Sequence, residues 1–210
     1  MICYTIGHST RKLEEFINTI TAYGIDCVMD IRSVPYSSNK FYNSYNREFV
    51  EKEIKQSGIN YIYVGDILGY HGKGKNLSYK ECKEEFDNII ECSFFKKGIN
   101  RIIEGIRRGH KIALMCSEKN PFNCHRSILL GYALEQEGIE VKHIIDEEKF
   151  KTQKRIEEEL FVTYEPMLKD KFLQLTIQDI LDKENYDEVD EKAIKAKIID
   201  EGYRIKFQQI

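Results

Sequence analysis

The sequence predicts an α/β fold, a mostly parallel sheet of about five strands with helices on both faces, followed by a charged helical C-terminal extension. Three observations indicate this. Short β-branched or apolar runs alternate with longer helical patterns over residues 1–150. Polar and titratable residues follow several of these runs. From about residue 151 the pattern is charged and helical. We therefore expect an α/β core domain at 1–150 and a helical extension at 151–210.

The first half of the predicted core consists of three strands and the helices between them. An apolar run predicts a strand over residues 2–6, and apolar residues at helical spacing predict a helix over 13–20. A second strand is expected at 26–31. Another helix ends at the Gly58 stop signal, and a third strand follows at 61–64. Such alternation favours parallel strands joined by right-handed crossovers.

The second half of the core begins after residues 66–78, a glycine-rich segment that we expect to be a mobile loop near a site. Two helices are predicted around 79–92 and 98–108. They lead to the remaining strands and a last helix of the core, predicted at 111–115 (strand), 126–137 (helix) and 141–145 (strand). The apolar residues of the extension are expected to dock onto the core or onto a second subunit, so a homo-oligomer stays open.

Charge and composition exclude some classes of function. The 32 Lys and Arg residues against 35 Asp and Glu give a net charge of −3, which does not support a nucleic-acid partner. No apolar run approaches the roughly 18 residues of a membrane span, so no membrane partner is expected. The first residues lack the pattern of a signal peptide, which predicts a cytoplasmic protein. In that compartment cysteines serve catalysis, metal binding or redox sensing more often than disulfides.

The segment from Cys116 to Ser127 carries the most informative motif. A strand leads to Cys116, a polar loop follows, and a helix then opens with His125, Arg126 and Ser127. Amides at a helix N-terminus and a guanidinium fork both bind anions, so we expect Arg126 and Ser127 to bind the ligand. The same groups lower the pKa of a nearby thiol. We therefore expect Cys116 or Cys124 to be a reactive thiol with His125 as proton carrier. The other four cysteines are expected to lie in the core; they are Cys3, Cys27, Cys82 and Cys92.

The same motif raises the question of a metal cofactor. Cys116 and Cys124 have seven residues between them and no second short pair accompanies them, so a four-ligand structural zinc is not favoured. A three-ligand transition-metal site drawn from Cys116, Cys124, His125 and His8 stays open. We expect the neighbouring side chains of Cys124 and His125 to point in different directions, which argues against both binding one ion.

Further polar residues follow the first, second and fourth strands. They are His8, Ser9, Thr10, Asp30, Arg32, Tyr36 and Glu118. Because the carboxyl ends of parallel strands meet at one edge of the sheet, we expect them to gather there. His8 is a candidate base and Glu118 an orienting acid, while the others would bind the ligand. The alternatives are a capped helix after His8, an Asp30–Arg32 ion pair and simple packing of the aromatic residue.

These motifs together resemble a known family. Ile6-Gly7-His8-Ser9-Thr10, the segment 30–35 (DIRSVP), Leu68-Gly69, and Leu114–Glu118 with Pro121 and Cys124-His125-Arg126 are similar to the four-eight-eight family of domains of unknown function in bacteria and archaea. The resemblance covers about residues 1–150. It implies an α/β fold with the motif residues gathered at one site, and it implies no particular activity.

Three hypotheses for function follow. The first is an enzyme that acts on a small anionic, phosphate- or nucleotide-like ligand, as a cysteine- or metal-dependent hydrolase or transferase. The second is a redox- or metal-responsive regulator in which Cys116 and Cys124 sense the signal and the helical extension transmits it. The third is a nucleic-acid-associated module, which the net charge disfavours.

Overall fold

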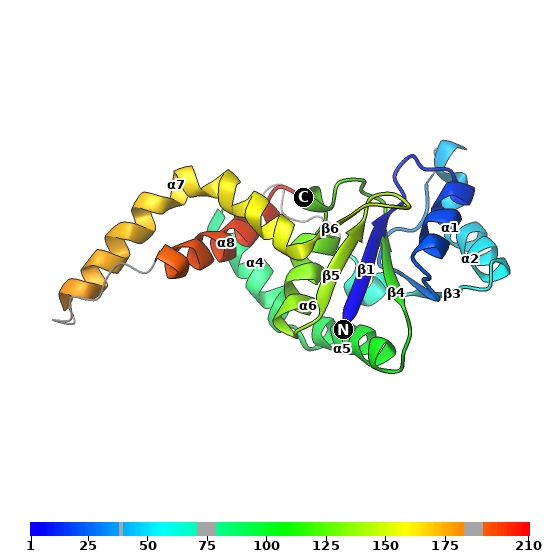
Figure 1. Ribbon diagram of the computed structural model, residues 1–210, viewed down its shortest axis with the longest axis horizontal. Helices are drawn as coiled ribbons and strands as arrows, with labels where there is room; N and C mark the ends of the chain where they lie inside the picture. Colours follow the sequence, from blue (N-terminus) through cyan, green and yellow to red (C-terminus); the bar gives the residue numbers. More distant parts are fainter. Residues whose placement is uncertain (38–39, 71–78, 183–190) are drawn as a thin grey trace.

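A computed structural model of the chain describes residues 1–37, 40–70, 79–182 and 191–210, and it confirms the α/β fold (Figure 1). Six strands form one sheet in the order β3-β2-β4-β1-β5-β6. The strands are β1 (Ile2–Gly7), β2 (Cys27–Asp30), β3 (Asn60–Tyr63), β4 (Ile112–Cys116), β5 (Glu140–Ile144) and β6 (Phe150–Thr152). The first five pair in parallel, as predicted, while β6 runs antiparallel to β5.

Helices cover both faces of the sheet. They are α1 (Leu13–Ala22), α2 (Arg47–Gln56), α3 (Gly65–Leu68), α4 (Tyr79–Glu91), α5 (Ser93–Arg107), α6 (Tyr132–Gln136), α7 (Gln153–Asp182) and α8 (Glu191–Phe207). The predicted helix over 126–137 is a π-helix over Arg126–Gly131 that continues as α6. The glycine-rich loop predicted over 66–78 begins later than expected, because residues 66–68 form part of the helix α3, and residues 71–78 lie outside the described ranges. None of the helices in the described ranges has the length and apolar character that crossing a membrane requires.

The alternation of side chains along β4 divides the core into two clusters. Ile112, Leu114 and Cys116 pack on one face with α5, α7 and α8. Ala113 and Met115 pack on the other face with α1 and α2. Because successive side chains of a strand point to opposite faces, this register decides which face each residue at the end of β4 can reach. Cys116 therefore lies on the face covered by α5, α7 and α8.

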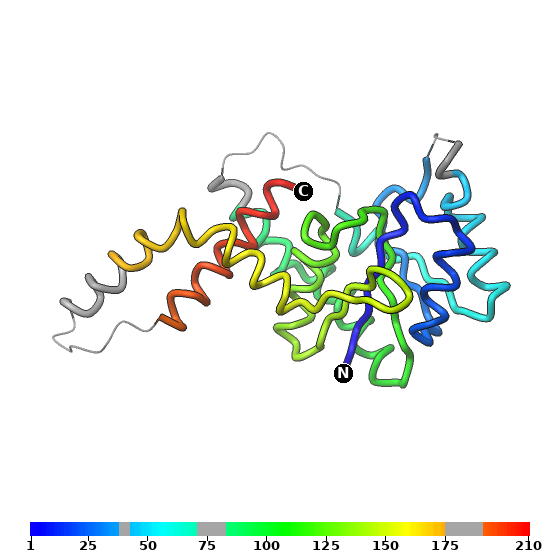
Figure 2. Tube along the Cα trace, turned by 45° about the horizontal axis from the view of Figure 1, so that its top comes forward, coloured from blue at the N-terminus to red at the C-terminus, as the bar shows by residue number. Residues whose placement is uncertain are grey.

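Helices α7 and α8 lie side by side and extend away from the sheet (Figures 1 and 2). Their apolar residues nevertheless belong to the same core cluster as α5 and β4; among them are Ile156, Leu160, Tyr164, Ile198, Tyr203 and Phe207. The expected docking of the extension onto the core is therefore observed. The boundary at residue 150 stays a prediction. Of the four cysteines expected in the core, Cys3 and Cys27 are buried, the side chain of Cys82 lies outside the description, and Cys92 is exposed beside the start of α5.

A buried polar network joins the sheet to the C-terminal helices. The ring of His143 lies 2.7 Å from the Thr5 hydroxyl through Nδ1 and 2.7 Å from Gln153 Oε1 through Nε2. Since the amide oxygen of Gln153 only accepts, Nε2 carries the proton and Nδ1 accepts from Thr5. Gln153 Nε2 donates in turn to the Ser127 carbonyl and to the Tyr203 hydroxyl. This chain of bonds connects β1, β5 and α7 with α8.

The neutral His143 makes folding sensitive to acid. Burial, with Arg126 and Lys151 as neighbouring cations, lowers its pKa to about 3 despite the bond to Gln153. The unfolded state therefore binds a proton first as the pH falls below about 6.5, and the folded state loses stability by about 1.4 kcal/mol per pH unit until about pH 3. In urea titrations from pH 7 to pH 4, we expect this slope to be smaller in His143→Gln than in the wild type. Equal slopes would contradict the assignment.

Candidate functional site

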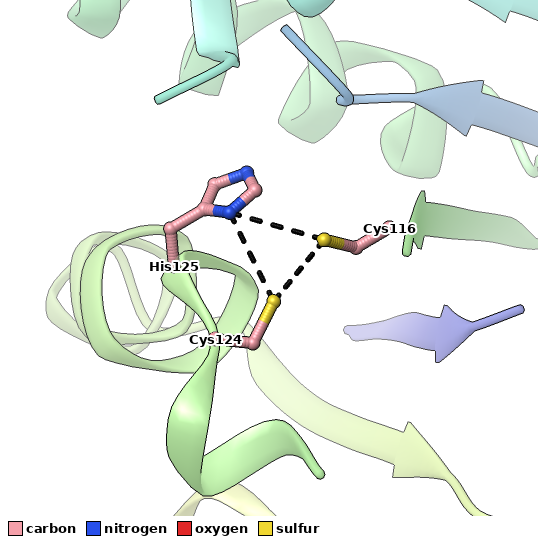
Figure 3. A group of neighbouring side chains, drawn as sticks. All are labelled: Cys116, Cys124 and His125. Atoms are coloured by element: carbon pink, nitrogen blue, oxygen red, sulfur yellow. Dashed lines mark hydrogen bonds between the residues drawn. The ribbon is translucent and has the colours of Figure 1, made fainter. Parts of the chain in front are cut away.

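Two cysteines and one histidine converge at the carboxyl end of β4 (Figure 3). The sulfur atoms of Cys116 and Cys124 are 3.2 Å apart, and Nδ1 of His125 lies 3.9 Å from each sulfur. One ligand atom from each residue falls within 4.8 Å of the other two. These residues therefore form a compact group of two soft sulfur donors and one imidazole nitrogen.

The backbone explains why neighbouring Cys124 and His125 point to the same place. Cys124 is extended, with φ −139° and ψ 140°, where it ends the 3₁₀ turn Pro121–Asn123. His125 is helical, with φ −56° and ψ −23°, and opens the π-helix. The chain thus turns between the two residues, and the alternation of a strand does not apply. The expectation that these side chains diverge is wrong.

Ser127 and Arg126 stabilise the loop between β4 and the π-helix. The Ser127 hydroxyl donates to the Pro121 carbonyl and, at 3.3 Å, to that of Cys124. The guanidinium of Arg126, which is fully buried, donates to the carbonyls of Glu118 and Lys119. Both residues were expected to bind the ligand. The structure instead directs their polar groups to backbone carbonyls, so we assign them to positioning the loop.

The two sulfurs differ in their electrostatics. The Cys124 thiol donates toward Cys116, and this bond lowers the pKa of the Cys116 thiol well below its ordinary value. Burial opposes the shift, while His125 and Arg126 add to it. Burial and the neighbouring Cys116 raise the pKa of Cys124. Of the two thiols, Cys116 is thus the one that loses its proton more readily, and Cys124 is its hydrogen-bond donor.

His8, Asp30 and Arg32 form a second group, at the carboxyl ends of β1 and β2. Arg32 forms a two-pronged ion pair with Asp30, through Nε at 2.9 Å and Nη2 at 2.6 Å. Its Nη1 donates to the Tyr45 carbonyl at 2.8 Å and faces His8 Nε2 at 3.4 Å. The Tyr61 hydroxyl also donates to Asp30, at 2.6 Å. The predicted ion pair is therefore present, and it orients the guanidinium beside the histidine.

His8 is held in one neutral form. Its Nδ1 donates to the Ser9 carbonyl at 3.1 Å, which leaves Nε2 as the acceptor that faces Arg32. The ring stacks on Tyr45 with centroids 4.0 Å apart. Burial, followed by the charge of Arg32, lowers the pKa of His8 to about 4. The imidazole is therefore uncharged near neutral pH, with its basic nitrogen at the site.

Two neighbouring cavities open at this edge of the sheet. Cavity A, of about 340 Å³, is lined by His8, Ser9, Arg32, Val34, Tyr36, Ser37, Tyr45, Asn46 and Ser117. Cavity B, of about 420 Å³, is lined by Arg32, Ser33, Val34, Tyr70, Cys116, Ser117, Glu118, Asn123, Cys124, His125 and Ile210. Arg32, Val34 and Ser117 line both. The cysteine group and the His8–Arg32 group therefore line two adjacent cavities that share three lining residues.

The remaining predicted residues divide between the two cavities and the surface. Ser9 and Tyr36 line cavity A, and Ser9 adopts the unusual φ of 46°. The Tyr36 hydroxyl donates to Glu48, and half of its side chain is exposed. Glu118 lines cavity B. Thr10 is exposed and lines neither cavity.

The comparison with protein families identifies the family of this chain. The family model described as "Domain of unknown function DUF488" matches residues 12–133. The chain belongs to the DUF488 family. The matched segment of this DUF488 protein contains Asp30, Arg32 and the whole Cys116–Ser127 motif, whereas His8 and α8 lie outside it. Comparison with curated proteins and with solved structures gives no match.

The end of α8 supplies a wall of cavity B in this DUF488 protein, which sequence reasoning missed. Phe207 packs on Tyr70 with ring centroids 4.8 Å apart, and Ile210 lines the cavity beside Tyr70. Lys206 Nζ lies 4.5 Å from the ring centre of Phe122, two residues before Cys124. No local pattern marks Ile210, because only the packing of α8 brings it there. Ser33 and Val34, in contrast, lie within the recognised 30–35 motif.

Proposed function

We propose that this DUF488 protein is a metal-dependent enzyme acting on a small anionic ligand, and that Cys116, Cys124 and His125 bind its metal, zinc. The observation that carries the proposal is the convergence of two sulfurs and one imidazole nitrogen beside a cavity. Structural zinc sites use four protein ligands, whereas catalytic ones use three and leave a position for water or substrate. A Cys₂His set that lines a cavity matches the second kind.

The distances suit zinc. Bonds of about 2.3 Å to sulfur and about 2.0 Å to nitrogen, at tetrahedral angles, place two sulfurs about 3.8 Å apart and each sulfur about 3.5 Å from the nitrogen. The corresponding distances here are 3.2 Å and 3.9 Å. Small side-chain rotations therefore bring the three donors into a tetrahedral arrangement. Soft sulfur and imidazole donors favour zinc over magnesium or calcium.

The charges around the group support an anionic ligand. Two thiolates would balance one Zn²⁺, which leaves the buried positive charge of Arg126. Within the described residues the guanidinium of Arg126 bonds to backbone carbonyls and to no carboxylate. A buried charge without a counterion is costly, so an anion at the open position lowers the energy of the site. Arg32 lines both cavities, but its charge is paired with Asp30, so the charge that calls for an anion is that of Arg126.

The chain's own residues would orient the ligand and handle its proton. When bound, zinc supplies Lewis acidity and lowers the pKa of a coordinated water. Ser117 and Asn123 line cavity B and offer polar groups to the ligand. His8 lines cavity A as a neutral imidazole, and its Nε2 would accept a proton only after the facing Arg32 guanidinium moves off it toward the ligand. The arrangement suits hydrolysis or group transfer.

The proposal is tested by measuring metal content. The protein is purified under reducing conditions, and zinc is quantified by mass spectrometry in the wild type and in Cys116→Ser, Cys124→Ser and His125→Gln. We expect about one zinc per chain in the wild type and loss of most of it in each variant. Cys92→Ser, at an exposed cysteine outside the group, is the matched control and should keep its zinc.

Cobalt replacement gives a second readout. Cobalt(II) bound by thiolates absorbs strongly through sulfur-to-metal charge transfer, so the loaded wild type should be coloured and the Cys116→Ser variant much less so. A wild-type protein that binds neither zinc nor cobalt would overturn the proposal that the three residues form a metal site. If selective alkylation then located the fast-reacting thiol at Cys116, the enzyme would be a cysteine-dependent one instead.

A further inference from the structure

We propose that Cys116 and Cys124 are a site of oxidative modification, at which a hydroperoxide joins the two sulfurs in a disulfide and thereby expels the metal. The release of metal rests on the proposed function, whereas the formation of the disulfide does not. The disulfide form would be a reversible, metal-free state of the site. The same pair of sulfurs would then both bind the metal and respond to an oxidant.

The geometry of the pair carries this inference. The two sulfurs are 3.2 Å apart and both thiols are free. A disulfide requires about 2.05 Å, so closure needs a movement of little more than 1 Å. Cys124 lies in the loop between the 3₁₀ turn and the π-helix, while Cys116 ends a central strand. A shift of this size is within the range of side-chain rotation at the two residues and does not require the loop to leave its place.

An oxidant can reach these sulfurs although little of their surface is exposed. Cys116 and Cys124 are 4% and 3% exposed, yet both line cavity B. That cavity, of about 420 Å³, admits a small hydroperoxide easily. Cys3 and Cys27, in contrast, lie in the core, where burial raises the pKa of Cys3 to about 12 and that of Cys27 to about 11. Those two thiols are therefore poor targets.

The chemistry balances in two steps. One thiolate sulfur attacks a peroxide oxygen; the O–O bond breaks, hydroxide leaves, and a sulfenic acid forms. The second thiolate attacks that sulfur; the S–O bond breaks, another hydroxide leaves, and the S–S bond forms. Two thiolates thus give up two electrons in total, which reduce the hydroperoxide to hydroxide, or to hydroxide and an alkoxide. The zinc ion leaves with its charge unchanged.

Loss of the metal follows from the number of ligands. A disulfide sulfur is a poor donor compared with a thiolate, so oxidation removes two of the three protein ligands. His125 alone remains, and a single imidazole does not retain zinc against a chelator. A dithiol reductant should reverse the change, because it breaks the disulfide and regenerates both ligands.

The test follows zinc and disulfide in the same sample. Zinc-loaded full-length protein is treated with one equivalent of hydrogen peroxide in the presence of a colorimetric zinc chelator, then alkylated and digested for peptide mass spectrometry. We expect one disulfide linking Cys116 to Cys124 for each zinc released, and rebinding of zinc after reduction. Cys92→Ser should behave like the wild type, since Cys92 is exposed and outside the group.

Further variants and the metal-free protein separate this inference from the proposed function. In Cys124→Ser, oxidation of Cys116 should stop at a sulfenic acid that dimedone traps. A protein without metal that still forms the Cys116–Cys124 disulfide would overturn the metal site and the metal release but keep the modification site. Zinc-bound protein that forms no Cys116–Cys124 disulfide after peroxide, or that is oxidised only at Cys92, would overturn the proposed modification site. The proposed metal site would stand in that case.

Discussion

Gly7→Ala is expected to lower the free energy of unfolding by about 3 kcal/mol or more and to abolish the candidate site. A Cβ at Gly7 would lie 1.8 Å from the carbonyl oxygen of Glu118 and 2.9 Å from Nη1 of Arg126. Neither neighbour can move away easily, because that carbonyl accepts from the same guanidinium. The loop after β4 would have to leave the end of β1. Urea denaturation and zinc content of the variant measure both effects.

Gly105→Ala is the matched control for this substitution. Its Cβ would approach the terminal methyl of Ile112 at 2.6 Å, and a flexible side chain of this kind can yield. Because alanine is favoured over glycine inside a helix such as α5, we expect a change within about 1 kcal/mol. If Gly7→Ala were as mild as the control, the close crossing of β1 by the loop would not be essential to the site.

Arg126→Lys is expected to cost about 3 kcal/mol of stability even though it keeps the positive charge. The guanidinium of Arg126 donates to the carbonyls of Glu118 and Lys119 at the same time. The ammonium of a lysine lacks the planar array of donors that this requires, so it cannot replace both bonds. Hydrogen bonds from a charged donor contribute about 1.5–3 kcal/mol each, and the lysine would remain buried. Chemical denaturation of the variant and the wild type measures the difference.

The control for this second prediction is Arg108→Lys. Arg108 is a mostly exposed residue at the end of α5, with a long contact of 3.9 Å to Glu104. A surface pair of this kind contributes little, so we expect no more than about 0.5 kcal/mol. An Arg126→Lys variant as stable as this control would show that charge alone, and not the fork, holds the loop.

Part of the fold and the site was predictable because it is encoded locally. Periodicity of apolar residues located the five parallel strands and the longer helices between them to within a few residues, but not the four-residue helix α3. The strand β6 was missed, since Phe150–Thr152 contains one apolar residue and is defined by its pairing with β5. Helix α5 begins at Ser93, earlier than the expected residue 98, because the chain re-enters a helix directly after Cys92.

The sequence by itself determined the α/β class and the edge of the sheet that carries the polar residues, and it indicated the Cys116–Ser127 motif as a candidate site, because strand order along the chain and residue type suffice for these. The tertiary structure alone decided the rest. It turned the chain between Cys124 and His125 so that both meet Cys116, and it directed Arg126 inward to the carbonyls of Glu118 and Lys119. It also brought Ile210 of the distant C-terminal segment to cavity B. Such contacts depend on backbone torsions and on packing between segments far apart in the chain, which local patterns do not encode.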